Sequence, residues 1–157
     1  MEHGPAFQNP GSGKILVYKL RSDGFIAFET EDKTKPSFVT TREKIWHGGE
    51  LTINIKAQNA TVAVYDSCES EDMGGNVLGM AVPLEGYGHE DCIPFGGDSI
   101  DWTVCYKNGR TLDELKNKTL VFEVKFTDGS LYSISGDFTD VFNTQAARFR
   151  KFGILPR

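Results

Sequence analysis

Two strand-like segments in the second half of the chain alternate apolar and polar residues and are joined by a short connection. The first covers residues 97–106 and the second covers Leu120–Phe126, with one helical turn expected over Thr111–Leu115 between them. Alternation with a period of two is typical of strands that have one buried face. A parallel sheet would need long helical crossovers, so this pattern favours antiparallel β structure.

Further strand-like runs occur on both sides of this region. Leu51, Ile53 and Ile55 share one face of such a run, and Gln58-Asn59 after it suggests a turn and a hairpin. The sequence therefore predicts an all-β fold with about nine or ten strands, arranged as a two-sheet antiparallel β-sandwich of jelly-roll type. The additional expected strands are Lys14–Leu20, Phe25–Glu29, Ser37–Thr40, Glu50–Ala57, Thr61–Ser67, Val77–Val82 and Leu131–Ser135.

The two ends of the chain differ from its middle. Residues 1–13 are rich in proline and glycine and are expected to form an arm or linker, followed by the sandwich over 14–137. Residues 138–157 are expected to add one short C-terminal α-helix that packs on the sandwich. Apolar residues recur there at helical spacing, at Phe138, Val141, Phe142, Phe149 and Phe152.

Composition limits the possible partners. The chain has 157 residues, of which 39% are hydrophobic, which is enough for one domain with a sizeable core. Its net charge is −5 with dispersed lysine and arginine, so the sequence argues against nucleic acid as a partner. It has neither the apolar run that spans a bilayer nor the pattern of a signal peptide, so we expect no membrane partner and the compartment is left open.

The three cysteines are Cys68, Cys92 and Cys105. Their odd number and wide spacing give no paired metal motif and no closed disulfide framework. One bridge between Cys68 and Cys92 is left open, but the pattern favours three buried thiols.

Several blocks of the sequence together resemble a known domain type. They are Tyr18–Phe25, Glu50–Ile55, Gly97-Asp98 leading to Val104-Cys105-Tyr106, Leu112–Leu115, Val121–Phe126 and Leu131-Tyr132-Ser133. In order and spacing, over residues 15–135, they resemble the C-terminal β-sandwich of five-bladed-propeller proteins related to glycoside hydrolases of the invertase and arabinanase type. The chain departs from that pattern at Tyr106, where the family usually has tryptophan, and in its additional C-terminal helix.

This resemblance implies a non-catalytic accessory domain of a carbohydrate-active protein. The catalytic carboxylates of such a protein lie in the propeller, so the expected partner is a catalytic propeller domain or a polysaccharide, and no catalytic residue is assigned to this chain. A free-standing carbohydrate-binding module has the same sandwich architecture and is the alternative. A self-contained glycoside hydrolase is a third interpretation, for which two carboxylates would have to face each other across a cleft.

Sugar binding would depend on aromatic faces with polar groups nearby, because pyranose C–H groups stack on flat rings. The candidate glycan-binding residues are Tyr87, His89, Trp102 and Trp46. Tyr87 lies in a glycine-flanked loop and is the residue most expected to be exposed, whereas the two tryptophans are more consistent with packing in the core.

Acidic residues concentrate between Asp66 and Asp91, but no motif fixes a catalytic pair among them. His89 lies three residues before Cys92 without the signature of a nucleophile couple, so a surface histidine beside a structural cysteine is expected. No cofactor is predicted, but a structural calcium ion is possible because carboxylates in a loop are suitable hard ligands. The candidate calcium ligands are Asp66, Glu69, Glu71 and Asp72.

Overall fold

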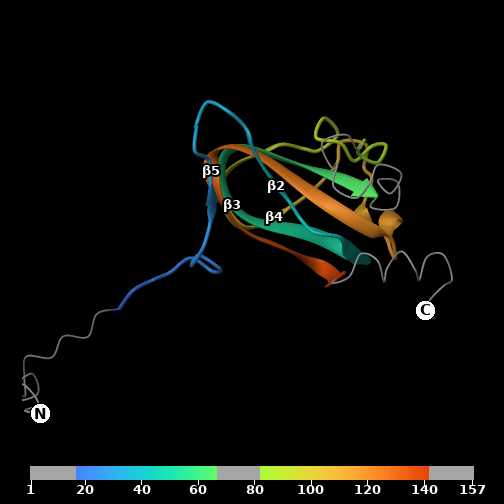
Figure 1. The fold of residues 1–157 in the computed structure, drawn as a ribbon, viewed down its shortest axis with the longest axis horizontal. Coiled ribbons are helices and arrows are strands. Elements are labelled where there is room, and N and C mark those ends of the chain that lie inside the picture. The colour runs from blue at the N-terminus through green and yellow to red at the C-terminus, as the bar shows by residue number, and fades with distance from the viewer. Residues whose placement is uncertain (1–16, 67–81, 142–157) are drawn as a thin grey trace, which may run out of the picture.

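A computed structural model describes residues 17–66 and 82–141 of the chain (Figure 1). The described part consists of antiparallel strands with one short 3-10 helix, which confirms the all-β prediction. The strands are β1 (Phe28–Glu29), β2 (Ser37–Thr40), β3 (Lys44–Asp66), β4 (Phe95–Thr103) and β5 (Thr119–Asp140), and the 3-10 helix is η4 (Leu112–Leu115).

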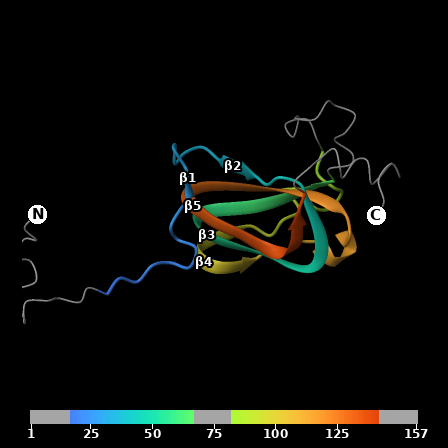
Figure 2. The same cartoon turned by 60° about the horizontal axis from the view of Figure 1, so that its bottom comes forward.

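Two long strands, β3 and β5, form the framework of the fold. Residue numbers fall along β5 as they rise along β3, from Lys44 opposite Asp140 to Asp66 opposite Leu120, so the two strands run antiparallel. Lys44 is also paired with Leu120. Because one end of β3 meets both ends of β5, the sheet curls and its walls face each other across the interior, as Figure 2 shows.

The shorter strands extend this pair on both sides. The five strands form a single sheet in the order β1-β5-β3-β4, and β2 also pairs with β5. On one side β4 pairs with β3, with Thr103 opposite Thr52. On the other side, Ser37 of β2 lies opposite Phe126, and Phe28 of β1 lies opposite Leu131.

Three sites with residues typical of turns are instead places where a long strand bends. The predicted hairpin at Gln58-Asn59 is wrong, because β3 continues through it with a register shift between Ala57 and Ala60. β3 also contains Gly48-Gly49, and β5 contains Thr127–Gly129. Positive φ values at Gly48 (109°) and Asp128 (41°) mark these bends. Bulges and glycine allow a strand to curl while its partner continues the ladder.

The ends of the described region differ from expectation in two places. Residues 17–20 are not in a strand, although they belong to the expected strand Lys14–Leu20. Phe138–Asp140 lie in β5, so the expected C-terminal helix does not begin at 138. The arm over 1–13, the strand expected from Val77 to residue 81 and the remainder of the helix over 142–157 lie outside the described residues.

The core fills the inside of the curled sheet. Trp46 is fully buried, contacts the edge of Phe122 with ring centroids 5.6 Å apart, and donates a hydrogen bond from Nε1 to the Leu112 carbonyl at 2.9 Å. Leu112 and Leu115 of η4 are also buried in this core. The hydrogen bond satisfies the indole N–H, so the largest core side chain leaves no polar atom unpaired.

Candidate functional site

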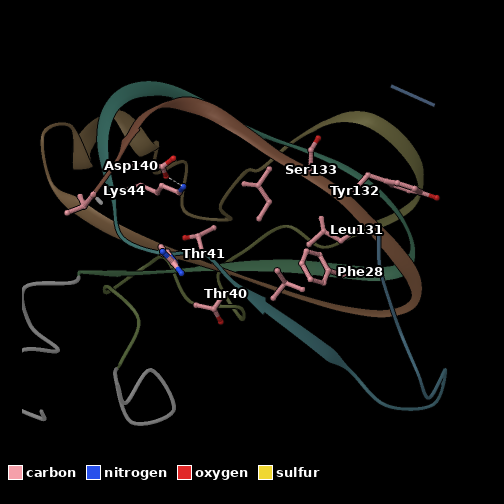
Figure 3. A pocket seen from close by; sticks show the side chains of 12 residues that line it. Phe28, Thr40, Thr41, Lys44, Leu131, Tyr132, Ser133 and Asp140 are labelled. Carbon is pink, nitrogen blue, oxygen red and sulfur yellow. Dashed lines mark hydrogen bonds and ion pairs between the residues drawn. The ribbon is translucent and has the colours of Figure 1, made fainter. Parts of the chain in front are cut away.

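A cavity of about 430 Å³ opens beside the second half of β5, between β1 and the end of β2 (Figure 3). Leu131 is buried at its floor, and Val39 and Ile134 pack against the main core. Phe28, which is 60% exposed, stands beside Leu131. The described lining comprises Phe28, Val39, Thr40, Thr41, Arg42, Lys44, Leu131, Tyr132, Ser133, Ile134, Asp140 and Val141.

Charged groups gather at one end of this cavity. Lys44 forms an ion pair with Asp140, and its ammonium group lies 5.0 Å from the centre of the Phe138 ring. Arg42 is exposed and forms no ion pair with residues in the described ranges. The described lining holds one carboxylate, Asp140, whereas glycoside hydrolysis uses two. An apolar floor of this kind suits an apolar side chain better than a reacting sugar.

Arg21 anchors the N-terminal segment to the sheet. Its Nε donates to Asn54 Oδ1 at 2.6 Å, and Nη2 donates to the Ser99 carbonyl at 2.6 Å. It also forms an ion pair with Asp98, and its guanidinium lies 4.6 Å from the centre of the Tyr132 ring. One side chain thus joins β3, β4 and β5 to the segment that precedes β1. The sequence alone did not identify this role, although Arg21 and Asp98 both lie in the blocks that carry the resemblance.

Asn54 is the counterpart of Arg21 and is only 2% exposed. Its Nδ2 donates to the Ser22 carbonyl at 2.6 Å, so both ends of the amide bind the N-terminal segment. Buried amide groups are costly unless they are paired. This pairing therefore holds residues 21–22 in place.

The anchored segment exposes large apolar side chains, which we call the N-terminal apolar surface. Phe25 is 84% exposed and Ile26 is 78% exposed. Phe28 belongs both to this surface and to the cavity, so the two are continuous. These side chains follow one another along a single segment, whereas exposed apolar residues that occur singly need no explanation. The members are Val17, Tyr18, Leu20, Phe25, Ile26 and Phe28.

Two of the four candidate glycan-binding residues have no free aromatic face. The expectation that Tyr87 is exposed is wrong, because it is 1% exposed and packs edge-on against Tyr106, with ring centroids 5.0 Å apart. Its hydroxyl donates to the Thr111 carbonyl at 2.9 Å, and burial raises its pKa. Trp46 is fully buried in the core. The structure therefore uses both residues in packing.

Trp102 is a candidate whose ring is not fully buried. It is partly buried on β4 and stacks on Phe95 of the same strand, with centroids 5.0 Å apart and planes inclined by 19°. Ile100, which is 57% exposed, lies two residues before it. The Phe95 ring covers one face of the indole, so a ligand would have to use what remains of the other face or its edge.

His89 belongs to a polar network on the outer face of the sheet. Its Nε2 lies 3.1 Å from Glu123 Oε1, and its Nδ1 lies 3.0 Å from Thr61 Oγ1. The Tyr65 hydroxyl donates to the same Glu123 oxygen at 2.9 Å. Burial, followed by this hydrogen bond, raises the pKa of Tyr65 to about 12. The network fastens the loop that carries His89 to β3 and β5, and it is far along the sheet from Trp102.

The candidate calcium ligands are only partly described. Asp66 ends β3, and its Oδ2 lies 3.8 Å from Lys118 Nζ. Glu69, Glu71 and Asp72 lie outside the described residues. Within residues 17–66 and 82–141, no cluster of histidine, cysteine and acidic side chains has the arrangement of a metal site.

A second hollow, of about 450 Å³, lies in the loops after residue 82. Its charged lining residues are Glu85, Glu90, Asp91 and Arg110. Arg110 is paired with Glu114 at 3.4 Å and lies 5.5 Å from the centre of the Tyr87 ring. The basic group is therefore already used in holding the loop onto the 3-10 helix.

The cysteines do not all share one environment. Cys92 is a buried free thiol whose pKa is raised by burial, and its Sγ accepts a hydrogen bond from the Val62 amide at 3.3 Å. Cys105 is free but exposed, so the expectation of three buried thiols is wrong for this residue. Cys68 lies outside the described residues.

Within the described part of the chain, no helix has the length and apolar character needed to cross a bilayer. No protein-family model, no curated protein and no solved structure matches this chain.

Proposed function

We propose that this chain is a non-catalytic accessory domain of a carbohydrate-active, glycoside-hydrolase-like protein, and that its partner is a catalytic propeller domain. The observation that carries the proposal is the N-terminal apolar surface, in which six large apolar side chains within residues 17–28 are exposed and the last of them, Phe28, also lines the cavity. A domain that orients a larger catalytic body needs such a contact area.

The resemblance supports the same function. Its blocks Glu50–Ile55, Leu112–Leu115 and Val121–Phe126 fall on β3, η4 and β5, the elements that build the framework. Its first block contains Arg21, and Gly97-Asp98 supplies the ion-pair partner of Arg21. We infer that the curled sheet corresponds to the two-sheet jelly-roll sandwich of that family, with opposite walls of the curl as the two layers.

A carbohydrate-binding module is the second candidate, favoured by the stacked and partly exposed Phe95 and Trp102. Flat rings at a sheet edge are suitable for a sugar face. The second candidate and the accessory domain differ in what they bind: an accessory domain binds protein, whereas a module is retained by polysaccharide.

Affinity electrophoresis through gels that contain arabinan, fructan, cellulose or xylan separates these functions. The accessory domain is expected to migrate equally with and without polysaccharide, and Trp102→Ala is expected to behave like the wild type. Retardation of the wild type that Trp102→Ala abolishes would replace our proposal with the binding module. Release of reducing sugar by the purified protein, measured on the same polysaccharides, would contradict the non-catalytic assignment.

A further inference from the structure

The cavity of Figure 3 lies beside the edge of β5 that pairs with β1 and β2. β5 pairs with β3 along its length, and on its other edge the described strands pair with residues 119–120, 123–126 and 130–131 but not with the residues after 131. The cavity is lined in part by Val39 and Ile134, which are partly buried and pack against the core. Apolar surface left open in this way costs free energy unless another element covers it.

The chain itself leaves the sheet at this cavity. Val141, the last described residue, is part of the lining, and its amide donates to the Glu43 carbonyl at 3.2 Å. Residues 142–157 follow directly, so they start at the wall of the cavity. Residue 142 is covalently joined to Val141, so docking of this segment on the cavity is intramolecular. Its effective concentration at the cavity therefore exceeds the concentration that a separate partner would usually have.

The sequence of that segment suits the cavity. Phe142, Ala146, Phe149 and Phe152 follow each other at intervals that place them on one face of a helix. A helix over 142–152 would be about 16 Å long, which is enough to extend across an opening of this volume. The opposite face carries cations, and the segment has no acidic residue, whereas the whole chain has a net charge of −5. The cationic residues are Arg148, Arg150, Lys151 and Arg157.

We propose that residues 142–157 form an amphipathic helix that docks on this chain's own cavity, with Phe142, Phe149 and Phe152 against Leu131, Val39 and Ile134. The cationic face of the helix then faces solvent, beside the remainder of the chain, which carries a net negative charge. Docking completes the wall that β1, β2 and β5 leave open. It also leaves the N-terminal apolar surface beyond Phe28 free, so this inference does not depend on the proposed function.

Hydrogen exchange read by mass spectrometry tests the helix directly. In the full chain, we expect amides within 144–152 to exchange at least about tenfold more slowly than in Phe149→Ser, because docking and helix formation are coupled. Lys151→Ser removes a cation of the opposite face and is expected to keep the protection. Absence of protection in the wild type, or equal loss in both variants, would overturn the proposal.

Cavity access gives a second test that does not depend on the helix signal. The test uses a variant with Ser133→Cys, which places a thiol in the cavity lining, and Cys105→Ser, which removes the exposed thiol. Peptide mass spectrometry then measures the rate at which a maleimide labels residue 133. Labelling is expected to be about tenfold slower in the full chain than in the Phe149→Ser form, with circular dichroism showing that both are folded. Equal rates would overturn the proposal, as would protection that disappears on dilution, because that result assigns the contact to a second copy.

Discussion

Arg21 Nε donates a 2.6 Å hydrogen bond to Asn54 Oδ1, and this contact joins the segment before β1 to the centre of β3. Asn54 is 2% exposed, so its amide depends on Arg21 and on the Ser22 carbonyl. Removing a partner from a buried polar group costs more than the net value of the hydrogen bond. Arg21 thus holds the position of the N-terminal apolar surface.

Arg21→Ala is therefore expected to lower the free energy of unfolding by about 1–3 kcal/mol. It should also make residues 17–26 much more sensitive to limited proteolysis, because the segment loses its anchor. Urea unfolding and mass spectrometry of the proteolytic fragments measure the two effects. Lys19→Ala changes an exposed side chain of the same segment and serves as the control. Equal stability of the two variants would show that Arg21 does not anchor the segment.

Gly129 lies where β5 bends against β3. A Cβ at this position would come within 2.2 Å of the Lys56 carbonyl oxygen and 2.6 Å of the Ala57 Cα, and backbone cannot move aside as a side chain can. Gly129→Ala is expected to destabilise the protein by about 1–3 kcal/mol in urea unfolding. Ser135→Ala, at an exposed position of the same strand, provides the control. A Gly129→Ala protein as stable as this control would mean that the strands are not this close.

Stability should fall at alkaline pH through Tyr65. Its pKa rises from 10.0 to about 12 on folding, chiefly through burial and then through the hydrogen bond to Glu123. The folded state holds the proton more tightly, so this contribution is complete below about pH 10 and is lost as pH rises towards 12. Tyr65→Phe should lose less stability than the wild type between pH 9 and pH 11 in urea unfolding, with Tyr18→Phe as an exposed control. Identical pH slopes for the wild type and Tyr65→Phe would exclude this role.

The two described thiols should react at different rates. Cys105 is exposed, whereas Cys92 is buried with a raised pKa, and the thiolate is the reactive form. Alkylation by iodoacetamide near neutral pH, followed by peptide mass spectrometry, is expected to modify Cys105 at least about tenfold faster. In denaturant the rates should converge. Faster modification of Cys92 in the folded protein would contradict its placement in the core.

The sequence predicted strand content far better than strand length. Alternation at Leu51, Ile53 and Ile55 correctly gives the buried face of β3. The same pattern cannot distinguish a hairpin from a bulge, because Gln58-Asn59 and Thr127–Gly129 are suitable for either. Pairing between β3 and β5, which lie far apart in sequence, decides the matter and keeps each strand continuous.

Residue type was a weaker guide to the candidate site. Asn54 lies between Ile53 and Ile55, so the alternation predicts that it faces away from the core, yet it is buried because a long-range contact with Arg21 satisfies its amide. Tyr87 was expected at the surface because glycines flank it, but Thr111 and Tyr106 enclose it. The cavity depends on how β1 and β2 meet the edge of β5, a relationship that no local pattern encodes.

The central claim is that the N-terminal apolar surface binds a catalytic propeller. Isothermal titration of this chain into a purified five-bladed-propeller domain of an invertase- or arabinanase-type enzyme, prepared without its own sandwich, tests it most directly. We predict saturable binding with a Kd of about 1–100 µM, abolished in the Phe25→Ser/Ile26→Ser double variant and retained in Ile100→Ser, which changes an exposed residue on β4. No heat of binding, or equal binding by the double variant, would contradict the account.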